Sequence, residues 1–213
     1  MTFMTGTLAT VTAVALLGGF APSEGLAAPP GDQVLASVDA PGADGYSIAE
    51  PRAIAVKGVM SARIEARVAT NCANAWQVFT DFDAMPSFLP GMETSKVISR
   101  EGGRVILMQR GHHRYGIFAR QYQSERELTM REPALIESRS LPGDEMAIAS
   151  ATSFTPTERG GCVIESSANI DLPAWAPEAA AAGFIKSLAS AQMRAMLAEV
   201  KRRYPPTSMP GHG

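Results

Sequence analysis

The sequence predicts one α+β domain in which a curved antiparallel sheet of about seven strands wraps around a long C-terminal helix. Three observations predict this fold. Residues 58–70 alternate apolar and polar side chains, as a strand with one buried face does. A short amphipathic helical stretch follows, and then about eighty residues of strand-like periodicity. An alanine-rich helical stretch closes the domain.

The first strand leads into two short helices. Apolar residues recur at helical spacing in the stretch NCANAWQVFTDF, and Asn71 is placed to cap its first exposed N–H groups. Pro86 prevents a long continuation, so we expect a second short helical turn that stops at Pro90 and Gly91. Asp81 and Asp83 are interpreted as caps of these helix ends.

The pattern after Gly91 indicates six further strands in meander order. A Glu-Gly-Gly turn at 101–103 predicts a hairpin, and Glu-Pro, Pro-Gly-Asp and Arg-Gly-Gly sequences separate the later strands. The final helix runs from about residue 174 to 204. Because it is the only element long enough to cover the sheet, we expect the sheet to curl around it and to leave a cavity between them.

The chain outside this domain has a different composition. Residues 1–28 are interpreted as an export signal, because the run from Leu8 to Phe20 is uncharged and small residues at 26–28 resemble a signal-peptidase site. The usual basic start is missing, since the first basic residue is Arg52, so a buried helix or a disordered leader is the alternative. Residues 29–57 are expected to form a flexible linker or arm, 58–204 the domain, and 205–213 a disordered tail.

The two cysteines are expected to meet if the first strand of the domain pairs with the last. Antiparallel pairing brings Cys72, near the end of the first strand, beside Cys162, near the start of the last. A disulfide there would fit export to an oxidising compartment, the periplasm or cell envelope. Two buried free thiols are the alternative.

The charge pattern and the motifs do not favour nucleic acid, a metal or a cofactor. The net charge is −2 and no basic run forms a stripe. His112 and His113 lie between glycines and are interpreted as exposed residues of a hairpin turn. No metal-ligand spacing and no nucleotide-binding fingerprint occurs in the sequence.

The order of elements resembles the START-like (SRPBCC) superfamily of helix-grip proteins, in its polyketide cyclase/dehydrase and coenzyme Q-binding branch. The resemblance covers about residues 58–204 and rests on AWQVFTDFDAMPSFLPG after the first strand and DLPAW before the final helix. The matching positions are Trp76, Asp81, Pro86, Phe88, Pro90 and Gly91. The resemblance implies a pocket for hydrophobic molecules such as lipids, isoprenoid quinones or polyketides.

Seven residues are the candidate ligand contacts: Phe88, Leu89, Met92, Met108, Trp175, Phe184 and Leu188. The alternatives are that Phe88 and Leu89 only fix the second short helix to the sheet, that the methionines fill the core, and that Trp175 is a structural staple.

The expected function is non-catalytic binding or carriage of a hydrophobic ligand by an exported protein, with transient membrane contact left open. A cyclase/dehydratase enzyme is the alternative. It requires an acid and a base in the cavity, with Arg110, His112, His113 or Glu165 pointing inward. A cytoplasmic protein that docks on a macromolecule through its sheet is a third interpretation.

Overall fold

The computed structural model describes residues 42, 45–115, 118–144, 147–172 and 176–205, and within them nine strands form one antiparallel sheet. In chain order the elements are β1 (Tyr46–Ile48), β2 (Arg52–Val56), β3 (Val59–Val68), α1 (Cys72–Thr80), η1 (Phe82–Ser87), β4 (Met92–Glu101), β5 (Arg104–Tyr115), β6 (Phe118–Arg131), β7 (Leu135–Ser140), β8 (Ile148–Pro156), β9 (Cys162–Asp171) and α2 (Glu178–Arg203). The expected export signal lies outside the described residues, as do Trp175 and nearly all of the expected tail.

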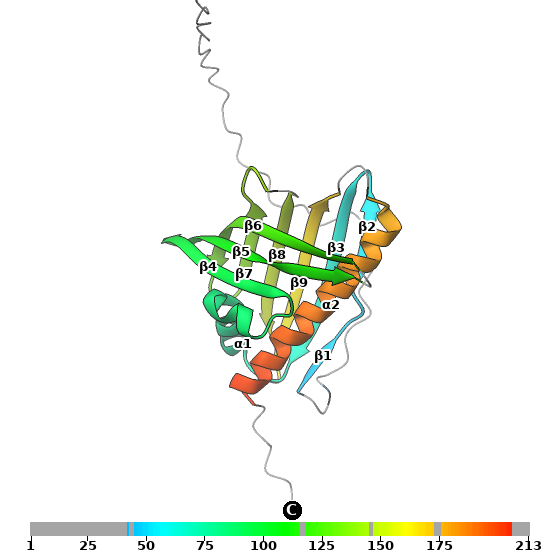
Figure 1. Ribbon diagram of the computed structural model, residues 1–213. Helices are drawn as coiled ribbons and strands as arrows, with labels where there is room; N and C mark the ends of the chain where they lie inside the picture. The colour runs from blue at the N-terminus through cyan, green and yellow to red at the C-terminus, as the bar shows by residue number, and fades with distance from the viewer. Residues whose placement is uncertain (1–41, 43–44, 116–117, 145–146, 173–175, 206–213) are drawn as a thin grey trace, which may run out of the picture. The chain divides into compact units, whose positions relative to one another are not determined.

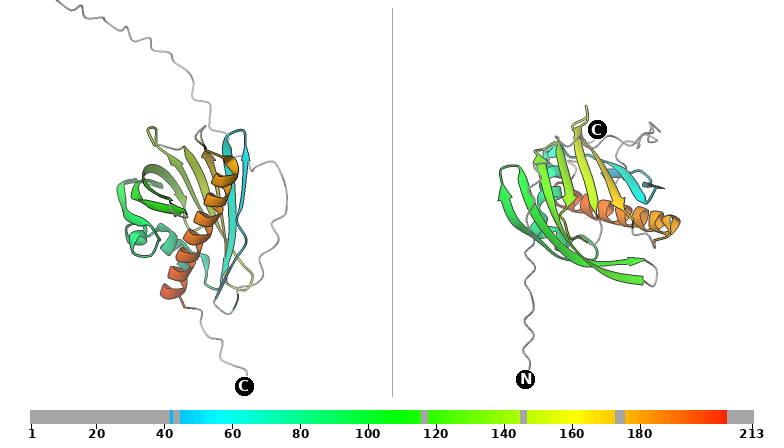
Figure 2. Two further views of the ribbon diagram at one scale, coloured as in Figure 1. Left: turned by 45° about the vertical axis from the view of Figure 1, so that its right-hand side comes forward. Right: turned by 90° about the horizontal axis from the view of Figure 1, so that it is seen from above.

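The predicted α+β fold is confirmed: the sheet is curved and α2 lies across its concave side (Figures 1 and 2). The strand order is β1-β3-β9-β8-β7-β6-β5-β4, with β2 also paired to β3. β3 pairs with β9 along its whole length, so the first predicted strand does meet the last. Two register shifts in β4 mark bulges, which bend and twist an edge strand.

The expectation of a linker over residues 29–57 is wrong for residues 46–56. There β1 pairs with β3 from Tyr46 opposite Val68, and β2 pairs with it from Arg52 opposite Arg63. These strands have only 3 and 5 residues, too few to show an alternating pattern in the sequence. They form because β3 offers them its second edge, and they account for the difference between nine strands and the predicted seven or so.

The two short helices after β3 form as predicted, and the glycine that follows them is held by backbone packing. The side chain of Asn71 caps α1 by accepting a 2.9 Å hydrogen bond from the N–H of Asn74. Gly91 has a positive φ of 78°, and its carbonyl accepts a 2.7 Å hydrogen bond from the N–H of His112. A Cβ at Gly91 would lie 2.2 Å from the carbonyl oxygen of His112. The chain leaving η1 is therefore fixed directly against β5.

Aromatic packing and a disulfide fix α1 to the sheet. The rings of Trp76 and Phe79 meet that of Phe154 edge to face, with centroids 5.4 and 5.2 Å apart. Cys72 and Cys162 are both buried and form a disulfide, with their Cα atoms 4.9 Å apart. The register that places Val68 opposite Cys162 brings the two sulfurs together.

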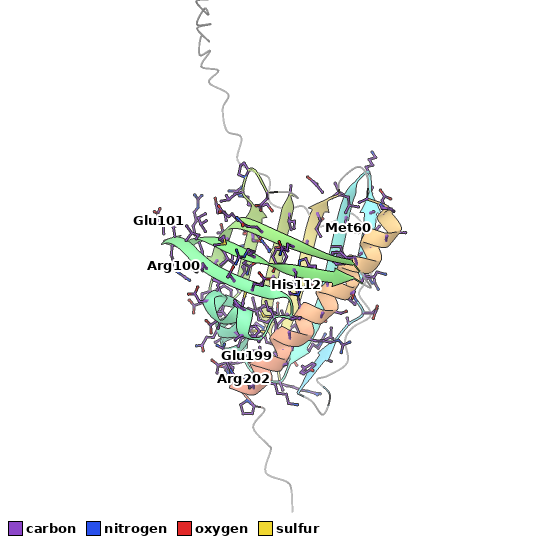
Figure 3. The ribbon with its side chains drawn as sticks, in the orientation of Figure 1. Met60, Arg100, Glu101, His112, Glu199 and Arg202 are labelled. Carbon is purple, nitrogen blue, oxygen red and sulfur yellow. A yellow bond between two sulfur atoms is a disulfide. The ribbon has the colours of Figure 1, made fainter. Side chains whose placement is uncertain are left out.

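Glu199 and Arg202 lie at the C-terminal end of α2 (Figure 3), where Arg203 bonds this helix to Asp81 at the end of α1. Glu199 accepts hydrogen bonds of 2.6 Å from both Arg202 and Arg203, and Arg203 also donates to Asp81 at 2.7 Å. The side chain of Asp81 therefore pairs with a distant arginine and does not make the helix cap expected of it. Tyr204 adds a hydrogen bond to Gln77 of α1.

Candidate functional site

A cavity of about 400 Å³ lies between α2 and the sheet. Its helix wall is formed by Ile185, Leu188, Ala189, Gln192, Met193 and Met196. Phe79 of α1, Phe82 and Met85 of η1, and the following Leu89 close one side. The proline-interrupted segment after the first helix is therefore a wall of the cavity, and most of that wall is apolar.

The sheet wall of the cavity carries small and hydroxylated side chains. The register places Leu128, Ser138, Ser150, Ala168 and Ala62 in one row across five strands. The next row toward α1 holds Ile136, Thr152, Ser166 and Ile64. Two hydroxyl pairs, Ser138 with Ser150 and Thr152 with Ser166, are hydrogen-bonded at 2.9 Å. The hydroxyls thus satisfy one another, and the small side chains leave the space that forms the cavity.

A polar group stands on β5 and β6 at the cavity wall. Gln109 and His113 of β5 line the cavity, as do Tyr122 and Arg126 of β6. The imidazole of His113 stacks on the ring of Tyr122, with centroids 4.3 Å apart and an interplanar angle of 8°. Arg126 donates to Gln109 at 3.1 Å and to Ser124 at 3.4 Å.

Burial determines the protonation of these groups. It lowers the pKa of His113, and the positive charge of Arg126 lowers it further, so the imidazole is neutral at pH 7. Burial raises the pKa of Tyr122, which keeps the phenol protonated. Burial also lowers the pKa of Arg126, but a guanidinium stays charged in proteins. The polar group on β5 and β6 therefore carries one positive charge, that of Arg126, beside neutral hydrogen-bonding groups.

Three of the seven predicted ligand contacts line the cavity: Leu89, Met92 and Leu188. Phe184 is not among the lining residues, and its ring lies 6.0 Å from that of His113. Phe88 was expected at the lip, but it is outside the lining and faces the guanidinium of Arg203 at 6.0 Å. Trp175 lies outside the described residues.

The expectation that Met108 contacts a ligand is contradicted by its place on β5. Leu107 and Gln109 line the cavity, and successive side chains of a strand point to opposite faces. Met108 therefore points away from the cavity.

The interpretation of both histidines as turn residues is also wrong. β5 continues to Tyr115, so His112 and His113 lie within a strand, where alternation sends one outward and the other inward. His112 is 46% exposed and lies 3.3 Å from Glu93, whereas His113 lines the cavity. Gly111 serves close packing here, because a Cβ on it would lie 2.1 Å from the carbonyl oxygen of Gly91.

The other polar residues that an enzyme would need do not face the cavity as free groups. Arg110 is 56% exposed and lies 3.8 Å from Glu93. Glu165 pairs with Arg63 at 2.5 Å. Of the four candidate acids and bases, only His113 points inward.

The described residues offer neither a metal site nor a helix that could span a membrane. They contain no group of three His, Cys, Asp or Glu side chains placed to hold a metal ion. None of the helices in this part of the chain is long and apolar enough to cross a membrane.

Residues 60–204 match the family model described as polyketide cyclase/dehydrase and lipid transport. The chain belongs to this family. No functionally curated protein matches its sequence. The activities in the family description act on hydrophobic small molecules, which agrees with an apolar cavity. The START-like superfamily inferred from the element order is thereby confirmed.

The solved structures that are similar to this chain include enzymes and a lipid transfer protein. The Zhui aromatase/cyclase from a Streptomyces species has a TM-score of 0.56 at 15% identity, over 68% of this chain and 95% of that chain. The STAR-related lipid transfer protein from Xanthomonas axonopodis has 0.56 at 12%, over 78% and 98%. The di-domain ARO/CYC BexL has 0.59 at 14%, over 73% and 52%, so the chain spans about half of it. At these identities the likeness shows the fold alone.

Proposed function

We propose that this protein binds and carries a hydrophobic small molecule, such as a lipid, an isoprenoid quinone or a polyketide-like compound, in the cavity between α2 and the sheet, without catalysis. The observation that carries the proposal is the cavity of about 400 Å³ with an apolar helix wall. A volume of this order is typical of small-molecule sites. An empty apolar space of this size forfeits packing contacts, which a bound apolar molecule restores.

The non-catalytic role rests on the surroundings of His113. An imidazole that acts as a general base is oriented by a hydrogen-bonding partner, as a rule a carboxylate. The ring face of His113 is covered by Tyr122, and no side chain among the described residues is found hydrogen-bonded to it. The arrangement supports an imidazole that forms part of the wall.

We also propose that the protein acts outside the cytoplasm, in the periplasm or cell envelope. The apolar stretch at residues 8–20 supports this location, and so does the disulfide, which is of a kind that persists in oxidising compartments. A carrier in that compartment would keep an apolar molecule out of water.

A cyclase or dehydratase is the second candidate function, and one observation favours it. His113 points into the cavity beside Tyr122, and the positive charge of Arg126 acts on the pKa of both. These groups could hold or move a proton on a substrate oxygen. This candidate predicts turnover of a polyketide-like substrate that His113→Gln abolishes.

Native mass spectrometry of protein purified from the envelope fraction of its own host tests the proposal. We expect an apolar molecule bound near one to one, recoverable by organic extraction, on a chain that lacks residues 1–28. Ala189→Trp, on the cavity wall, should abolish occupancy, whereas Ala191→Trp, on the exposed face of α2, should not. Protein that is empty and retains its N-terminus would overturn both the carriage and the export.

A further inference from the structure

The guanidinium of Arg126 stands in the cavity wall with most of its hydrogen-bonding capacity unused. Arg126 lies on β6 between two inward-facing neighbours, Ser124 and Leu128. Its side chain donates to the hydroxyl of Ser124 and to the carbonyl oxygen of Gln109. A guanidinium carries five N–H donors in a fixed planar fork, so several remain for another partner.

Gln109 is itself held so that its oxygen meets Arg126. It is 5% exposed, and its amide nitrogen lies 3.3 Å from the hydroxyl of Ser95. The same nitrogen lies 3.6 Å from the sulfur of Met85 and 3.8 Å from that of Met92. The amide group therefore orients the guanidinium but brings no negative charge to it.

Among the described residues, no carboxylate lies within ion-pair distance of Arg126. Its sequence neighbour Glu127 pairs with Arg139 at 3.2 Å. Asp144 is a more distant acid in the cavity wall, and its Oδ1 accepts from the backbone N–H of Glu125 at 3.1 Å. A half-buried cation without a close counter-charge is costly, because it has lost part of its hydration without gaining an ion pair.

We propose that the ligand of this cavity is an amphiphile with a carboxylate headgroup, held by Arg126, and an apolar body that lies along the helix wall. The inference rests on the proposed binding function and specifies its ligand class. An arginine fork matches a carboxylate with two parallel hydrogen bonds. The headgroup would supply the close counter-charge that Arg126 lacks among the described residues, since Asp144 acts on it only from a greater distance.

The remaining polar atoms of the wall favour a ligand whose headgroup has a single negative charge and a hydroxyl near it. The other arginine of the lining, Arg63, already pairs with Glu165, so the described wall has no second free cation for a doubly charged phosphate. Oδ2 of Asp144 is buried and accepts no hydrogen bond from any residue that the structure describes. It is a site for a hydrogen-bond donor, such as a hydroxyl on the same ligand.

A matched pair of fluorescent probes tests the headgroup. Dansyl-undecanoic acid and its methyl ester differ in charge but have nearly the same apolar body. The delipidated protein should bind the acid about 10- to 100-fold more tightly than the ester, the factor expected for hydrogen bonds to a charged group. Arg126→Met should remove this preference by weakening acid binding alone, and Arg126→Lys should keep part of it.

Arg110→Met is the control, because Arg110 is an exposed arginine next to Gln109 on β5, outside the cavity lining. It should leave the acid-to-ester ratio unchanged. Equal binding of acid and ester by the unmodified protein overturns the headgroup and leaves the proposed function standing. Binding of neither probe overturns both. If Arg126→Met does not fold, the ratio measured on the unmodified protein decides the matter.

Discussion

The two halves of α2 face the same sheet, yet only one is packed. Every buried residue of the helix lies from Met193 onward, and the first half has none. The C-terminal half faces α1 and a row of larger side chains, Phe154 and Ile164. The N-terminal half faces rows of serine and alanine. The cavity thus arises from small side chains on the sheet, while the other end of the helix supplies the stability that an unfilled space does not.

A leucine-to-alanine substitution should lower the free energy of unfolding far more at the packed end of α2 than at the cavity end. Leu197→Ala, at a fully buried position, should lower the free energy of unfolding by about 3–5 kcal/mol. Leu188→Ala only enlarges an existing cavity and should cost less than about 1 kcal/mol. Urea denaturation of the ligand-free variants measures both. Equal losses would mean that the cavity end is packed as tightly as the other.

The disulfide should be the next largest contribution at the packed end. It closes a loop of 90 residues, so reducing it should cost about 2–4 kcal/mol on the chain-entropy argument. Denaturation with and without dithiothreitol measures the loss. The Cys72→Ala/Cys162→Ala double variant is the control, since the reductant should not affect it. An identical midpoint for the unmodified protein under both conditions would contradict the bond.

The buried carboxylate of Glu199, which holds Arg202 and Arg203 at the end of α2, should give a smaller effect that depends on pH. The hydrogen bond from Arg202, with a further one from Arg203, lowers the pKa of Glu199 from 4.5 to about 2 in the folded protein. A depressed carboxyl pKa stabilises the fold above the unfolded value, and the contribution disappears as the pH falls through the folded value.

Glu199→Gln should therefore cost about 1–2 kcal/mol at pH 7. The gap from the unmodified protein should narrow below pH 4.5 and close near pH 2. Thermal unfolding across this range measures it, with Glu178→Gln, in the exposed first turn of α2, as the control. A gap that stays constant down to pH 2 would show that Glu199 acts through packing alone.

The packed end was more predictable from the sequence than the cavity end, because local patterns describe it. Alternation in β3 and the helical spacing of α1 identify its elements, and pairing the first strand with the last places Cys72 near Cys162. β1 and β2 were missed since their pairing with β3 is a tertiary contact between short segments. No local signal in three to five residues specifies such a contact.

The sequence does not predict the polar group of the cavity, because the glycines that flank His112 and His113 are typical of a hairpin turn. Gly111 looked like the start of a hairpin, whereas it allows close packing against Gly91. The period of two was nevertheless present: Leu107 and Gln109 lead on to His113, and Leu128 leads back to Arg126. If the alternation of each strand is continued through its polar residues, it places His113 and Arg126 on the buried face. That Arg126 has no close carboxylate among the described residues follows only from the three-dimensional arrangement.

Substitution of the hydroxyl pairs of the sheet wall should have the smallest effect on stability. This small effect would distinguish the sheet beside the cavity from the sheet beside the packed end of α2. In the part of the chain that the structure describes, the hydroxyls of Thr152 and Ser166 hydrogen-bond only to each other, at 2.9 Å. Replacing both with apolar residues of similar size, Thr152→Val with Ser166→Ala, should change the free energy of unfolding by less than about 0.5 kcal/mol, because no buried polar atom loses a partner. Ser166→Ala alone leaves the Thr152 hydroxyl unsatisfied and should cost about 1 kcal/mol. Urea denaturation of the single and double variants measures the difference. A double variant that loses more than the single one would mean that these hydroxyls support the fold itself, and that the cavity wall is not free to vary with the ligand.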